Sequence, residues 1–185
     1  VPLVVKGPAG CRRTALAAAL ASGARKRNLL AVTVHAGLTP GLPAEALVEL
    51  VCAALNLEFD ERFTRLPRAL EGLSLTDPVR EALLALCGVR PFPGHFSPGQ
   101  AAHAARVVLR AVAGDRPMVV IFDGLERLDD DSFEAFRLMA GRPASRELVV
   151  GLAAPSARDE ALAAFQAVDV PALTGAELFR VAGSM

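Results

Sequence analysis

The chain of 185 residues contains no tryptophan, no tyrosine, three cysteines and only two lysines. Without Trp or Tyr, and with its nine Phe expected mostly in the core, it offers no aromatic platform on which single-stranded nucleic acid could stack. Its 20 basic and 20 acidic residues give a net charge of zero, so the electrostatic footprint of a nucleic-acid binder or a peripheral membrane protein is missing. We therefore expect neither nucleic acid nor a membrane as a partner.

Cysteine and histidine are also too sparse to build a disulfide framework or a zinc site. Cys11, Cys52 and Cys87 are far apart and form no CxxC pair, and the histidines lack ligand spacing to one another or to cysteine. Reduced thiols are typical of an intracellular protein, so we expect a cytoplasmic location. No apolar run reaches the roughly 20 residues that a membrane-spanning helix needs.

What the sequence does contain is a regular alternation of short β-branched runs and longer helical patterns. This alternation is typical of βαβ units with a mostly parallel sheet buried on both faces, and the length suits one full core. Five strands are predicted, at residues 1–6, 29–35, 118–123, 147–152 and 167–170. Helices are predicted at 14–22, 43–55, 98–113, 131–140, 157–165 and from 174 onward. Helix-start signals are Asp77-Pro78, Ser97-Pro98 and the capping box Thr174 with Glu177.

Residues 57–97 depart from this alternation. They are rich in leucine at helical spacing, contain no strand pattern and end in the Pro/Gly-rich segment PFPGHF. About 40 residues are too few for an independent core, so we predict a helical insertion that packs on the sheet or pairs with itself. The expected organisation is one α/β domain over residues 1–185.

The first strand leads into a glycine-containing loop and then a helix, over residues 7–14 (GPAGCRRT). The P-loop pattern is GxxxxGK[ST], and Gly7 and Thr14 match it. Arg12 stands in place of the second glycine, where a side chain hinders the approach of the backbone to a phosphate. Arg13 replaces the lysine and keeps its charge without its geometry. Alone, this loop could be an ordinary glycine-rich turn.

A second motif follows about 110 residues later. The apolar strand 118–123 ends in Asp123, followed by GLERLD. This looks like a Walker B strand, whose terminal acid holds Mg²⁺ opposite the P-loop, at the strand ends where α/β sheets place ligands. Thr14 and Asp123 are therefore the candidate Mg²⁺ ligands. The candidate phosphate-binding residues are Gly7, Gly10, Cys11, Arg12, Arg13 and Thr14.

In order and spacing these features resemble the AAA+ and STAND ATPases, the latter being ATP-dependent signalling switches that include the NACHT group. The resemblance implies a three-layer P-loop NTPase fold, with ATP or ADP and Mg²⁺ as cofactors. In NACHT-like members an acid three residues after the Mg²⁺ aspartate helps to activate water, and Glu126 stands at that offset from Asp123. The alternative is that Glu126 and the run 129–131 cap the following helix.

The sequence also departs from that family. Gly124 stands where many AAA+ ATPases have a catalytic glutamate, and only Ser156 offers a polar residue near the end of the fourth strand. Arg158 resembles an arginine finger, but a solvated arginine at a helix start explains it more simply. The small helical lid has no room before Met185, so we expect it to be absent.

Two functions follow from these residues. In the first, Arg12, Arg13 and Gly124 indicate a degenerate domain with no or very weak ATPase activity. It would act through protein partners as a regulatory or scaffolding module of a larger signalling protein, with the insertion as its contact surface and without any need for nucleotide. We expect such a chain to be a monomer.

The second function is a working nucleotide switch. Here Arg13 substitutes for the lysine and Glu126 orients the attacking water. Thr14 and Asp123 would hold Mg²⁺ as they do in an active P-loop enzyme.

Overall fold

The computed structural model describes residues 3–8, 12–37, 44–91, 96–155 and 158–171. Predictions that concern Gly10, Cys11, Ser156 and the helix from Thr174 lie outside the described residues. Within them, the predicted five-stranded α/β architecture is confirmed. None of the described helices is long and apolar enough to cross a membrane.

The centre of the molecule is a sheet whose strands all pair in parallel, in the order β2-β3-β4-β1-β5. Every residue of β3 is buried, as expected for a strand covered on both faces. The strands are β1 (Leu3–Lys6), β2 (Leu30–His35), β3 (Met118–Asp123), β4 (Glu147–Ala153) and β5 (Gln166–Asp169). Strand β4 thus separates the strand that precedes the loop from the strand that ends in Asp123.

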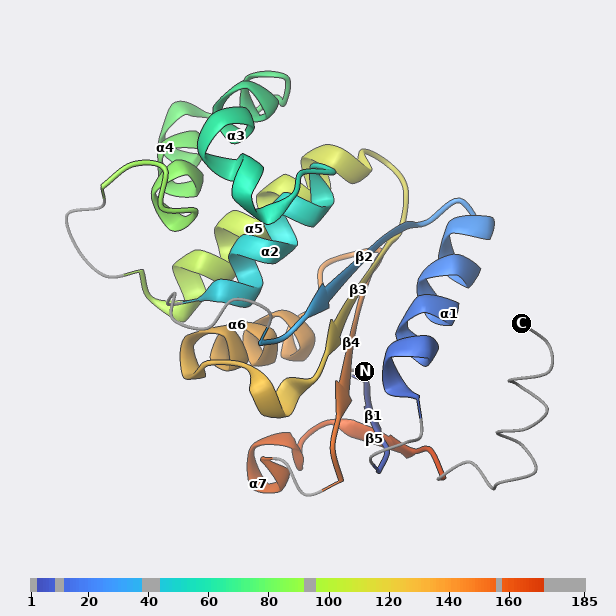
Figure 1. Ribbon diagram of the computed structural model, residues 1–185. Helices are drawn as coiled ribbons and strands as arrows, with labels where there is room; N and C mark the ends of the chain where they lie inside the picture. Colours follow the sequence, from blue (N-terminus) through green and yellow to red (C-terminus); the bar gives the residue numbers. More distant parts are fainter. Residues whose placement is uncertain (1–2, 9–11, 38–43, 92–95, 156–157, 172–185) are drawn as a thin grey trace.

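Helices cover both faces of this sheet and make three layers (Figure 1). One face carries α1 (Arg13–Lys26), and the other carries α2 (Glu45–Ala54), α5 (Pro98–Ala113) and α6 (Asp130–Gly141). A short α7 (Asp159–Leu162) precedes β5, and two 3₁₀ turns are η1 (Phe59–Glu61) and η2 (Leu125–Arg127). Helix α5 has the predicted bounds, because the Ser97 side chain accepts a hydrogen bond from the Gln100 N–H at its start.

Two helices, α1 and α7, end more than two residues away from their predicted C-terminal residues. Helix α1 continues to Lys26 instead of ending at Ser22, because Ala24 is buried in the same row as Ala17 and Ala21 and this packing outweighs the poor helix propensity of Gly23. Helix α7 is shorter than predicted.

The insertion forms a fourth layer. Its helices α3 (Arg62–Glu71) and α4 (Asp77–Leu86) contact each other, while α4 packs on α5 and η1 contacts α2. Figure 1 shows both helices beyond α2 and α5, away from the strands. Of the two predicted arrangements, α3 and α4 adopt the pairing with each other, and they do not reach the sheet because α2 and α5 already cover that face. Its leucines instead extend the helical core, with Leu66, Leu70 and Leu83 fully buried.

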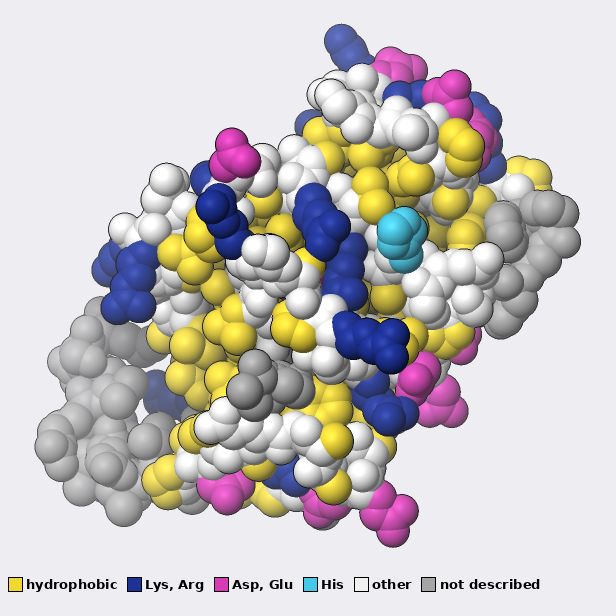
Figure 2. Space-filling view, turned by 180° about the vertical axis from the view of Figure 1, so that it is seen from behind, with side chains coloured by type: hydrophobic (Ala, Val, Ile, Leu, Met, Phe, Trp, Pro, Cys, Tyr) yellow, Lys and Arg dark blue, Asp and Glu magenta, His cyan; other side chains and the backbone are white. Residues whose placement is uncertain are grey.

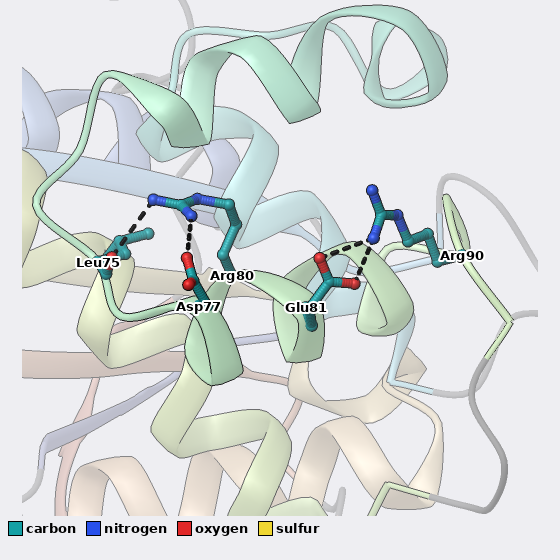
Figure 3. A network of polar contacts seen from close by, with 5 residues as sticks. All are labelled: Leu75, Asp77, Arg80, Glu81 and Arg90. Atoms are coloured by element: carbon teal, nitrogen blue, oxygen red, sulfur yellow. Dashed lines mark hydrogen bonds and ion pairs between the residues drawn. The ribbon is translucent and has the colours of Figure 1, made fainter.

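Two arginines make polar contacts at α4, the helix of the insertion that packs on α5 (Figure 3). The Arg80 guanidinium donates to the Asp77 carboxylate at 2.6 Å and to the Leu75 carbonyl at 3.3 Å. Arg90 donates to both oxygens of Glu81, at 2.7 and 2.6 Å. Thr76, one residue earlier than predicted, is the N-cap residue of α4. Exposed pairs of this kind contribute little to stability, so the buried leucines are what hold the insertion.

The two faces of the sheet are covered unequally. On the α1 side, small residues such as Ala17 and Ala21 allow the helix to lie close to the strands. Beside α1 an apolar groove of about 750 Å³ remains, and among its lining residues Leu20, Leu148 and Val168 keep 38%, 42% and 43% of their surface exposed. Figure 2 shows hydrophobic side chains reaching the surface in a band on the left of that view.

Candidate functional site

The parallel sheet brings the two sequence motifs to one edge of the molecule. Asp123, the last residue of β3, lies in register with His35 of β2 and Leu152 of β4. The Gly7 N–H donates to the carbonyl of Ala153 at 3.1 Å, so the loop after β1 leaves the sheet next to the end of β4. Pro8, Thr14 and Asp123 therefore line the same crevice at the carboxyl ends of the strands, where α/β folds bind ligands.

The two predicted Mg²⁺ ligands are in direct contact. The Thr14 hydroxyl donates a hydrogen bond to a carboxylate oxygen of Asp123 at 2.7 Å, across 109 residues of sequence. Asp123 is only 3% exposed, whereas Thr14 sits in the first turn of α1. A hydroxyl and one carboxylate suit Mg²⁺, which takes few protein ligands and completes its octahedron with phosphate and water. The donor set therefore fits this ion.

His35 is a third member of this cluster, and sequence reasoning missed it. Its Nδ1 lies 3.2 Å from the same Asp123 oxygen that Thr14 contacts. The spacing of the histidines argues only against a zinc site; the usable signal for this contact is that His35 and Asp123 each end a predicted strand. The backbone N–H of His35 donates to Glu49 of α2 at 3.0 Å, and burial raises the pKa of the Glu49 carboxyl.

Arg13 and Glu126 form an ion pair across the site. The Nη2 of Arg13 lies 2.8 Å from one Glu126 oxygen, and the other oxygen accepts a hydrogen bond from the Ala154 N–H at 3.0 Å. The Nη1 of Arg13 is buried without a hydrogen-bond partner among the described residues. Glu126 does not cap α6. That role belongs to Asp129, whose carboxylate accepts from the Ser132 N–H at 2.8 Å.

Arg12 stands at the sequence position of the second P-loop glycine and also has the backbone conformation that glycine favours. Its φ of 54° and ψ of 46° lie in the left-handed region, where glycine is favoured. The Arg12 side chain makes no capping hydrogen bond to the first turn of α1, that turn contains no acidic residue, and no other described side chain caps it. The orphan N–H groups and the positive end of the helix dipole are thus left for an external anion.

The residues of the site surround a pocket of about 500 Å³. Its lining residues are Pro8, Arg12, Arg13, Thr14, Ala15, Asp123, Glu126 and Arg127. The three arginines outnumber the two acids, so the pocket favours an anion, and the acids supply oxygen atoms for a cation. Arg127 was not among the predicted site residues.

Arg158 is held within its own chain. It donates to the carbonyl of Leu128 at 2.7 Å, pairs with Asp130 at 3.3 Å and stacks over the Phe133 ring at 4.1 Å. These contacts tie the guanidinium to the start of α6, so it does not project from the surface as an arginine finger would.

Comparisons with known proteins give only distant similarity. No protein-family model matches the sequence, and no curated protein matches it significantly. Among solved structures, a DnaB-like replicative helicase described with its interactions with primase is similar, at 15% identity and a TM-score of 0.42, over 85% of this chain and 40% of that chain. The ATPase domain of G40P is similar at 16% identity and a TM-score of 0.41, over 86% of this chain and 58% of that chain. This chain therefore spans about half the length of these two solved chains.

Proposed function

We propose that this domain binds the phosphate tail of ATP or ADP together with Mg²⁺. The contact between the Thr14 hydroxyl and Asp123, 2.7 Å long and placed at an uncapped helix start, carries the proposal. Thr14 and Asp123 would hold the metal ion, which neutralises charge on bridging phosphate oxygens when bound. The loop backbone and the first N–H groups of α1 would bind the phosphates.

Arg13 supplies the cation in place of the P-loop lysine. Its Nη2 is taken by Glu126, but its buried Nη1 has no partner among the described residues and is available for a phosphate oxygen. A guanidinium can serve two acceptors at once because its donors are arranged as a planar fork. The ion pair with Glu126 is therefore compatible with phosphate binding.

The same ion pair opposes hydrolysis. Both oxygens of Glu126 already accept hydrogen bonds, from Arg13 and from the Ala154 N–H. The two donors fix the orientation of the carboxylate and occupy two of its acceptor positions, which leaves fewer for the attacking water that a general base must reach. We therefore propose very weak or absent ATPase activity and a regulatory role, of the AAA+/STAND kind, within a larger signalling protein.

Thermal unfolding with and without millimolar Mg·ATP, Mg·ADP and Mg·GTP tests nucleotide binding. A ligand at 100 times its Kd stabilises the fold by about 2.7 kcal/mol, or about 5 to 10 °C in a chain of this size. We expect Asp123→Asn and Thr14→Val to lose this shift, and chelation of Mg²⁺ to reduce it in the unmodified protein. Thr64→Val is the matched control, because Thr64 is an exposed residue of α3. The shift between free and loaded protein is compared within each variant, because Asp123→Asn also alters the unliganded fold.

A domain that works only through protein contacts is the second candidate. The strained Arg12 and the Arg13–Glu126 pair across the pocket favour it. In that case no nucleotide shifts the unfolding temperature of the unmodified protein, and the double change Arg12→Gly, Arg13→Lys creates a shift. Phe63, 52% exposed on α3, would then be the first residue to test for partner contact in the insertion.

A further inference from the structure

Arg127 lies in a slot made by two glycines. A Cβ atom at Gly124 would come within 2.5 Å of Nη2 and 2.7 Å of Nε of Arg127, so the guanidinium covers the Gly124 backbone. A Cβ at Gly37 would lie 3.5 Å from the Arg127 Cβ and 3.7 Å from its Cδ. The glycines follow β3 and β2, and their φ angles of 92° and 79° are also unfavourable for any other residue. The absence of side chains at 124 and 37 sets the position of Arg127.

This slot holds Arg127 at the wall of the phosphate pocket. Among the described residues, no hydrogen bond or ion pair engages its guanidinium. Arg13, by contrast, is paired with Glu126, and Arg158 is tied to the start of α6. Arg127 is thus an exposed cation at the pocket wall, and its guanidinium makes no hydrogen bond or ion pair with any described residue.

The position of Arg127 indicates which phosphate it would meet. A nucleotide whose inner phosphates lie on the start of α1, and whose metal ion lies between Thr14 and Asp123, extends its terminal phosphate toward the end of β3. Arg127 follows Asp123 by four residues and lines the same pocket. Arg12 also lines this pocket, at the start of α1.

We propose that Arg127 binds the terminal phosphate of a nucleoside triphosphate and lets this site distinguish triphosphate from diphosphate. The inference rests on the proposed nucleotide binding. A guanidinium fork matches two phosphate oxygens, and the terminal phosphate presents three of them. Gly124, which reads in the sequence as the loss of a catalytic glutamate, is on this view the space that the arginine needs.

Calorimetric titration with Mg·ATP, a non-hydrolysable Mg·ATP analogue and Mg·ADP tests the proposal. Removing a charged hydrogen-bond partner costs about 1.5 to 3 kcal/mol, so Arg127→Ala should weaken triphosphate binding by about 10-fold or more. Its effect on Mg·ADP should be less than about 2-fold, because the diphosphate lacks the group that Arg127 contacts. Arg127→Lys should recover only part of the loss. Arg137→Ala is the matched control, since Arg137 is an exposed α6 arginine paired with Glu134.

Gly124→Ala provides an independent variant, because it displaces the guanidinium without removing its charge. As a single change, Gly124→Ala should reduce the preference for triphosphate over diphosphate. Added to Arg127→Ala, it should not change that preference further. Circular dichroism melts establish that each variant is folded. If both nucleotides bind and their affinity ratio is unchanged in Arg127→Ala, this inference is overturned and the proposed function stands. If no nucleotide binds the unmodified protein, both are overturned.

Discussion

At the scale of single residues, Arg12 is one of six described non-glycine residues with a positive φ, and it is the one that lines the pocket at the start of α1. Its φ of 54° places an arginine in the left-handed region, which costs a residue with a Cβ about 1 to 2 kcal/mol. Glycine avoids that cost but loses more freedom on folding. We expect Arg12→Gly to raise the free energy of unfolding by about 0.5 to 1 kcal/mol, measured by urea denaturation.

Arg12→Ala is the control for this prediction. Alanine removes the charge and the long side chain but keeps the Cβ, so it should retain the strain at the start of α1. An Arg12→Gly protein no more stable than the Arg12→Ala protein would mean that this backbone conformation costs the arginine nothing.

The residues of the site differ in how far the sequence could locate them. Thr14 and Asp123 could be placed together, because a loop after one strand and an acid at the end of another share an edge in any parallel sheet. The contact of His35 with Asp123 depends on which strands are neighbours and in what register. The Arg13–Glu126 pair depends on side-chain direction across β4, and no spacing in the sequence encodes that direction.

At the scale of elements, Gly151 controls how closely β4 and the helical layer approach. A Cβ at this position would lie 2.5 Å from Leu125 Cδ1 and 2.8 Å from Phe136 Cζ. Both side chains are fully buried, so neither can move aside without repacking the core. We expect Gly151→Ala to lower the free energy of unfolding by about 1 to 3 kcal/mol in urea denaturation.

Gly23→Ala gives the opposite expectation and serves as the matched variant. Gly23 lies inside α1, and a Cβ there would meet nothing within 4 Å. Alanine should therefore stabilise the helix by about 0.5 to 1 kcal/mol. Equal stability of the two variants would show that Leu125 and Phe136 repack freely around an added methyl group.

At the scale of the whole molecule, the strands and the helices next to the sheet could be predicted, and the layering of the insertion could not. Strand β3 has its predicted bounds because a short β-branched run between Pro117 and Gly124 is typical of a strand buried on both faces. The periodicity of α3 and α4 identifies an apolar face on each helix, but it does not say which surface covers that face. The covering surface follows from the positions of α2 and α5, which already occupy that face of the sheet.

The insertion shares its core with the rest of the domain, and two buried thiols can report on this. Cys52 of α2 and Cys87, just after α4, are each 2% exposed and belong to one apolar cluster. Burial raises the pKa of Cys52 to about 11 and also raises the pKa of Cys87, which suppresses the reactive thiolates. In a Cys11→Ser background we expect neither thiol to react with a disulfide reagent in the native protein.

Upon titration with urea, Cys52 and Cys87 should become reactive together, at the concentration where the helical circular dichroism signal is lost. Coincident transitions are expected of a single cooperative unit, and single-thiol variants, Cys52→Ala and Cys87→Ala, assign each transition to one layer. If Cys87 reacts at lower urea than Cys52, the insertion opens on its own. The chain would then consist of a sheet domain with a separately unfolding helical layer, and the pocket beside Thr14 would not depend on that layer for its shape.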